Sequence, residues 1–146
     1  TAFIHNIIGI SLSKFYRKRQ FFGYLVLSNS SSVGKFVGAN NLSNEEGIEV
    51  IRRFLSKSKI KSVYLEAGSG SKKPVDMKLV EEASKIIHRY PSGKLIVGGG
   101  IKSSREIKRL FHIGVDKVVI GTALEKSDIE GSLAVITSLI KPFSVL

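Results

Sequence analysis

The chain has 146 residues, of which 42% are hydrophobic and 24% charged, and this composition predicts one globular domain over 1–146 rather than a disordered segment. It contains no cysteine, which excludes disulfides and thiolate metal sites. The formal net charge of +11 favours anionic partners such as phosphates, nucleic acid or an acidic membrane surface. The sequence contains no apolar run of roughly 18 residues and no signal peptide, so we expect a cytoplasmic protein. Because it starts at Thr1 rather than at methionine, we expect a piece of a longer chain.

The predicted elements begin with a helix over 1–20, which ends in the basic run Arg17-Lys18-Arg19. From Gly23 onward, short apolar runs alternate with stretches whose apolar residues recur three and four positions apart. This alternation is typical of repeated β-α units. The four predicted strands cover 24–27, 63–65, 94–97 and 117–120.

Helices are predicted between and after these strands, and the polar stretch 28–34 is expected to be a flexible loop. A fourth helix is expected after Pro74, since proline favours helix starts. Phe111 is among the residues expected on an apolar helix face. Three helix starts carry the serine and glutamate spacing of a capping box. These pairs are Ser43 with Glu46, Ser103 with Glu106, and Ser127 with Glu130.

The strand that includes Tyr64 ends in a carboxylate, Glu66. Because side chains alternate along a strand, Tyr64 and Glu66 share one face, and we expect that face to point away from the helices. A carboxylate in the interior is costly unless it is used or paired. The alternative to a functional role is a structural one, in which Glu66 binds a neighbouring lysine or loop amides.

Glycine-rich loops follow three of the predicted strands, namely 67–71 (AGSGS), 98–100 (GGG) and Gly121-Thr122. Each loop alone could be a tight turn without a ligand. Together, at the carboxyl ends of neighbouring strands, they predict a phosphate site of the kind found in many (β/α)8 barrels. Lys72 and Lys73 lie beside the first loop and could attract a phosphorylated substrate.

Within 6–140, the stretches 64–70 (YLEAGSG), 95–101 (LIVGGGI) and 119–122 (VIGT), with Pro74-Val75, closely resemble geranylgeranylglyceryl phosphate synthase of archaea. The related bacterial heptaprenylglyceryl phosphate synthases are similar. The resemblance implies an α/β (β/α)8 TIM barrel of which this chain is the carboxyl-terminal half, about strands 5 to 8. It departs from the family at Phe21-Phe22, where the family usually has Pro-Thr.

The implied activity is that of a prenyltransferase, which joins sn-glycerol 1-phosphate to geranylgeranyl diphosphate with Mg²⁺ in archaeal ether-lipid biosynthesis. Glu66 would take or orient the proton of the attacking hydroxyl, and Tyr64 would position the glycerol. The resemblance places glycerol 1-phosphate at Tyr64, Leu65, Glu66, Ala67, Gly68, Ser69, Gly70, Gly99, Gly100, Gly121 and Thr122.

The resemblance also implies partners. The metal ligand is expected on the amino-terminal half of the barrel, which has no counterpart in this chain, so that half is itself an expected partner. A homo-oligomer and a peripheral contact with membrane are further expectations, and the isolated chain is expected to be inactive.

Two other functions compete with this interpretation. Another phosphate-binding TIM-barrel isomerase or synthase would share the glycine loops. A basic nucleic-acid-binding module would account for the net charge of +11, although no known nucleic-acid motif is present. His5, His88 and His112 lie apart on predicted helices, so we expect surface or packing roles for them.

Overall fold

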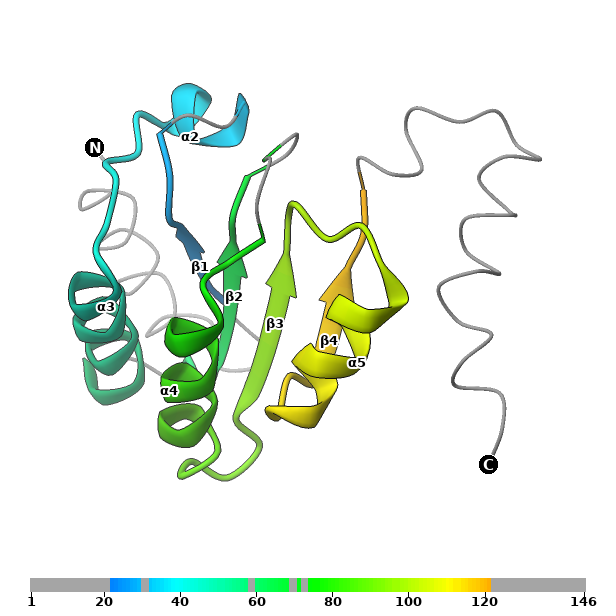
Figure 1. Cartoon of the computed structure of the whole chain (residues 1–146). Helices are drawn as coiled ribbons and strands as arrows, with labels where there is room; N and C mark the ends of the chain where they lie inside the picture. Colours follow the sequence, from blue (N-terminus) through cyan, green and yellow to red (C-terminus); the bar gives the residue numbers. More distant parts are fainter. Residues whose placement is uncertain (1–21, 30–31, 58–59, 69–70, 72–73, 122–146) are drawn as a thin grey trace.

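The computed structural model describes residues 22–29, 32–57, 60–68, 71 and 74–121. In this part of the chain a parallel sheet has the order β1-β2-β3-β4, as Figure 1 shows. Its strands are Phe22–Val26 (β1), Ser62–Glu66 (β2), Lys94–Gly98 (β3) and Lys117–Val119 (β4). The predicted helix over 1–20 and the capping box of Ser127 lie outside the described residues. The predicted parallel β-α arrangement is therefore confirmed for the described segments.

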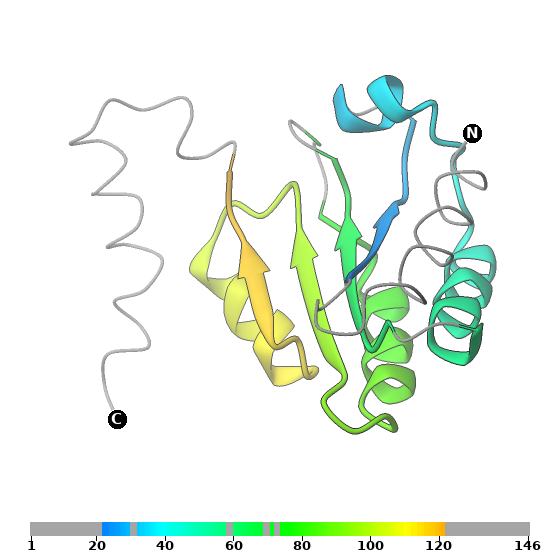
Figure 2. The same ribbon diagram turned by 180° about the vertical axis from the view of Figure 1, so that it is seen from behind.

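The longer described helices cover one face of the sheet, as the two opposite views in Figures 1 and 2 show. They are α3 (Asn44–Lys57), α4 (Met77–Ile87) and α5 (Ser104–His112), and the short α2 (Ser32–Val37) follows β1. Alternate strand residues, including Val63, Leu65, Leu95 and Val97, pack against the helices and are buried. On the opposite face, Phe22, Tyr24 and Val119 are 47%, 43% and 43% exposed.

Two of the three predicted capping boxes are present. The Ser43 amide donates to Glu46 (2.8 Å) and the Glu46 amide donates to the Ser43 hydroxyl (3.2 Å). Ser103 and Glu106 make the same reciprocal pair at the start of α5. Helix α4 follows Pro74 as predicted, but its N-cap is Asp76, whose carboxylate accepts from the Lys78 and Leu79 amides.

The structure corrects two local expectations. The stretch 28–34 is not a loop throughout, because α2 begins at Ser32. A helix of six residues is too short to show a helical period in the sequence. Phe111 was expected on the apolar face of α5, yet it is 41% exposed. Ile107 and Leu110 already fill the contact with the sheet, and the residue after Leu110 turns toward solvent.

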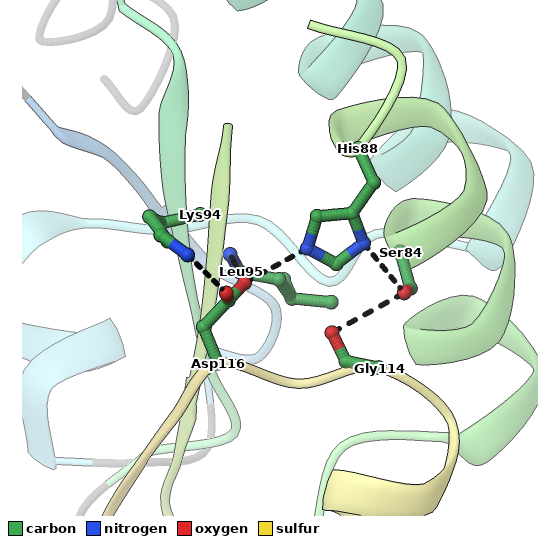
Figure 3. A network of polar contacts seen from close by, with 6 residues as sticks. All are labelled: Ser84, His88, Lys94, Leu95, Gly114 and Asp116. Carbon is green, nitrogen blue, oxygen red and sulfur yellow. Dashed lines mark hydrogen bonds and ion pairs between the residues drawn. The ribbon is translucent and has the colours of Figure 1, made fainter. Parts of the chain in front are cut away.

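A network of polar side chains joins α4 to the amino ends of β3 and β4 (Figure 3). One oxygen of Asp116 accepts from the Lys94 ammonium (2.7 Å), and the other contacts His88 Nε2 (2.9 Å) and the Leu95 amide (2.8 Å). His88 Nδ1 lies 3.2 Å from the Ser84 hydroxyl, which donates to the Gly114 carbonyl (3.3 Å).

This network is structural in its chemistry. Ser84 is 5% exposed and its hydroxyl is committed to a carbonyl, so it is not placed to act as a nucleophile. Burial alone would raise the pKa of Asp116, but the hydrogen bonds from Lys94, Leu95 and His88 outweigh burial and lower that pKa to about 2. The predicted packing role of His88 is thus supported by its partners.

None of the described helices is long and apolar enough to cross a membrane.

Candidate active site

A small pocket opens where β2, β3 and β4 end. Its volume is about 100 Å³, which holds several water-sized groups but is below the roughly 300–1,000 Å³ of sites for drug-sized ligands. Its size is therefore suited to a small ligand rather than to a long hydrocarbon chain. The residues that line it are Tyr64, Glu66, Gly99, Gly100, Ile101, Val119, Ile120 and Gly121.

Glu66 is the carboxylate of this pocket, and it is only 6% exposed. Its Oε2 accepts hydrogen bonds from the hydroxyls of Tyr64 (2.6 Å) and Tyr24 (3.3 Å). Its Oε1 accepts from the Gly68 amide (2.7 Å). The expectation that Tyr64 and Glu66 share the face away from the helices is confirmed. In the described residues the partners of Glu66 are two phenols and a loop amide. The structural alternative therefore finds its loop amide but not its lysine, and the activity measurement on Glu66→Gln has to separate the two roles.

The two phenols remain protonated donors at neutral pH. Burial, followed by the charge of Glu66 and the hydrogen bond to it, raises the pKa of Tyr24 to about 12. Burial and the same carboxylate also raise the pKa of Tyr64 above its usual value. Each hydroxyl therefore keeps its proton and can hold the Glu66 carboxylate in place.

The glycines that follow β2 and β3 permit close approach to this carboxylate. Gly68 and Gly99 have φ of 107° and 82°, a conformation that glycine adopts without strain. A Cβ on Gly99 would lie 2.5 Å from Glu66 Oε1. A Cβ on Gly98 would collide with the Tyr64 hydroxyl. Larger residues at 98 and 99 would therefore displace the groups that define the pocket.

The structure brings together five of the residues to which the resemblance assigned glycerol 1-phosphate. Tyr64, Glu66, Gly99, Gly100 and Gly121 line the pocket, and Gly68 joins them through its bond to Glu66. Leu65 and Ala67 are buried, and the Ala67 amide donates to the Gly98 carbonyl (3.0 Å). The remaining assigned residues lie outside the described residues, and they are Ser69, Gly70 and Thr122. Lys72 and Lys73, after the first loop, also lie outside them.

Tyr24 is a contact of Glu66 that the sequence did not reveal, and Gly98, from the predicted glycine loop 98–100, packs against Tyr64. The strand register pairs Tyr24 with Tyr64 and Glu66 with Gly98. The alternation rule applied to β1 would have placed Tyr24 on the face of Glu66. What the sequence lacked was the register between neighbouring strands.

Comparison with known proteins relates this arrangement to one family. A model described as the PcrB family matches residues 6–139. The geranylgeranylglyceryl phosphate synthase of Zunongwangia profunda is 38% identical over 111 residues, which cover 73% of this chain and 45% of that protein. The chain thus spans less than half the length of this curated relative.

Solved structures agree in fold. GGGPS from Thermoplasma volcanium matches with a TM-score of 0.68 and 21% identity, over 97% of this chain and 56% of that one. The Thermoplasma acidophilum (S)-3-O-geranylgeranylglyceryl phosphate synthase, solved with its substrate sn-glycerol-1-phosphate, matches with a TM-score of 0.64 and 26% identity, over 91% and 53%.

These comparisons confirm the resemblance stated from the motifs. The relatives include bacterial as well as archaeal proteins, so the archaeal assignment stays a prediction. With a family model matched over residues 6–139, the chain belongs to the PcrB family.

Proposed function

We propose that this chain supplies the sn-glycerol 1-phosphate site of a geranylgeranylglyceryl phosphate synthase. The observation that carries the proposal is the buried Glu66 carboxylate, which lines a small pocket and is held there by Tyr64. The solved relative from Thermoplasma acidophilum is complexed with sn-glycerol-1-phosphate, which supports the same ligand here.

In the proposed reaction the primary hydroxyl of glycerol 1-phosphate attacks the allylic carbon of geranylgeranyl diphosphate. A carbon–oxygen ether bond forms, the bond from that carbon to the diphosphate breaks, and diphosphate leaves with the bonding electrons. The hydroxyl proton passes to Glu66, which acts as general base. Tyr64 fixes the carboxylate through its 2.6 Å hydrogen bond, and the glycine loops would hold the phosphate through backbone amides.

The resemblance places the ligand of the expected Mg²⁺ on the amino-terminal half of the barrel. The described residues of this chain contain no group of three or more His, Asp or Glu side chains that could hold a metal. A Mg²⁺ ligand on the amino-terminal half stays a prediction.

The rest of the assembly belongs to the same proposal. The chain would form about strands 5 to 8 of a (β/α)8 barrel, because four strands do not close a barrel. The amino-terminal half would then cover the face on which Phe22, Tyr24 and Val119 are exposed. The proposal includes four further expectations. These are geranylgeranyl diphosphate as second substrate, a homo-oligomer, a contact with membrane and a cytoplasmic location.

Titration calorimetry of the 146-residue chain with sn-glycerol 1-phosphate tests the site. We expect saturable binding that Gly99→Ala weakens, because the new Cβ would lie 2.5 Å from Glu66 Oε1. Absence of saturable binding, together with salt-dependent binding of DNA or RNA, would instead favour the nucleic-acid alternative. Transfer of labelled glycerol 1-phosphate into a prenylated product by the native polypeptide that carries this chain tests the activity.

A further inference from the structure

We infer that Tyr24 is a positioning residue, which holds Oε2 of Glu66 so that Oε1 stays available to the substrate hydroxyl. The inference rests on the proposed function, in which Glu66 is the general base. It adds a residue from β1 to a site whose other described members come from β2, β3, β4 and the loops that follow them.

The position of Tyr24 follows from the sheet. Parallel pairing sets Tyr24 beside Tyr64, and the two rings meet edge to face with centroids 4.8 Å apart and planes at 84°. This contact directs both hydroxyls to the same oxygen, Oε2 of Glu66, at 3.3 Å and 2.6 Å. Tyr24 therefore reaches the carboxylate as a second donor from a separate strand.

The second donor, Tyr24, changes which acceptor positions of the Glu66 carboxylate are occupied. A carboxylate offers about four acceptor positions, two on each oxygen. The two phenols occupy Oε2, and the Gly68 amide takes one position on Oε1. Among the contacts of the described residues, the position left over is on Oε1, the oxygen close to Gly99, which lines the pocket. In the proposed mechanism this position accepts the substrate hydroxyl.

Tyr24→Phe removes the hydroxyl and keeps the ring against Tyr64. In the native polypeptide that carries this chain, we expect kcat to fall about fivefold, as for loss of one ordinary hydrogen bond. KM for glycerol 1-phosphate should change less, because the phosphate contacts are untouched. Tyr64→Phe should have the larger effect, since its contact with Glu66 is the shorter one.

The split between kcat and KM separates positioning from a structural role. A merely structural role would lower the melting temperature and the folded fraction while leaving kcat per folded molecule unchanged. A positioning role lowers kcat per folded molecule, while KM for glycerol 1-phosphate and the melting temperature change little.

Tyr90→Phe is the matched control. Tyr90 also carries a hydroxyl, but it lies in the turn before β3, away from the pocket. Its ring centroid is 4.7 Å from the Lys61 ammonium. We expect wild-type turnover per folded molecule for this variant. Unchanged kcat per folded molecule in Tyr24→Phe, with Glu66→Gln inactive, would overturn the inference and leave the proposed function standing. Full activity of Glu66→Gln would overturn the proposed function itself.

Discussion

Glu66 combines two demands that normally conflict, burial and negative charge. The structure meets both by directing two phenols and one amide at the carboxylate. The sequence motif identified Glu66 and Tyr64 because they lie two positions apart on one strand. Tyr24 lies 42 positions from Glu66. Alternation along β1 gives only the face on which Tyr24 lies, and the contact itself follows from strand pairing.

The first prediction concerns Glu66→Gln. It removes the base, so turnover should fall about a hundredfold or more. The amide nitrogen of glutamine also cannot accept the hydrogen bonds that one carboxylate oxygen now accepts, so we expect a loss of about 1–3 kcal/mol in the free energy of unfolding. Melting temperature and turnover should be measured on the same preparation. Unchanged turnover per folded molecule would remove Glu66 from the mechanism.

Gly98→Ala should damage the site without touching Glu66 directly. The added Cβ would collide with the Tyr64 hydroxyl, so Tyr64 must move and the bond to Glu66 must lengthen. We expect weaker glycerol 1-phosphate binding by calorimetry. Gly47→Ala is the matched control, because its Cβ would meet Leu79 at an ordinary 3.4 Å within α3, where alanine is favoured over glycine by about 1 kcal/mol. Equal binding by both variants would contradict the prediction.

At the scale of elements, helix starts are encoded locally and were therefore predictable. The capping boxes at Ser43 and Ser103 need only residues three positions apart, and both form. Helix α2 has no such signal within its six residues. The side of a helix that meets the sheet depends on tertiary packing, which is why Phe111 was assigned to the core and is exposed.

Asp76 tests the local encoding of α4. Its carboxylate accepts from the Lys78 amide at 2.8 Å and the Leu79 amide at 3.4 Å. Asp76→Ala should lower the free energy of unfolding by about 1 kcal/mol, whereas Asp76→Asn should retain most of the stability, because asparagine caps helices as well. Urea denaturation of both variants measures the difference. Equal losses in both would show that the cap contributes little.

At the scale of the whole molecule, the β-α alternation predicts parallel strands whose carboxyl ends share one edge. The pocket lined by Glu66, Gly99 and Gly121 confirms that the carboxyl ends of β2, β3 and β4 meet at one edge. The contacts at the opposite end of the sheet could not be predicted from this alternation. The network of Asp116 joins residues from α4, β3 and the turn before β4, and these meet only after the sheet has formed.

Through that network the free energy of unfolding depends on pH. The pKa of Asp116 is lowered from 3.8 to about 2 in the folded chain, so the folded state binds this proton less readily than the unfolded state. The resulting stabilisation is complete above about pH 5 and is lost as the pH falls toward 2. Asp116→Asn should therefore destabilise the protein near neutral pH and flatten the decline in acid.

Chemical denaturation between pH 2 and pH 7 measures this dependence, with Glu49→Gln as the control. Glu49 pairs with Arg53 at 3.1 Å, but both side chains are at least half exposed, and such surface pairs contribute little. We expect the control to follow the wild type throughout. If Asp116→Asn also follows the wild type, the carboxylate does not stabilise the fold, and the junction of α4 with β3 and β4 depends on the buried apolar contacts alone.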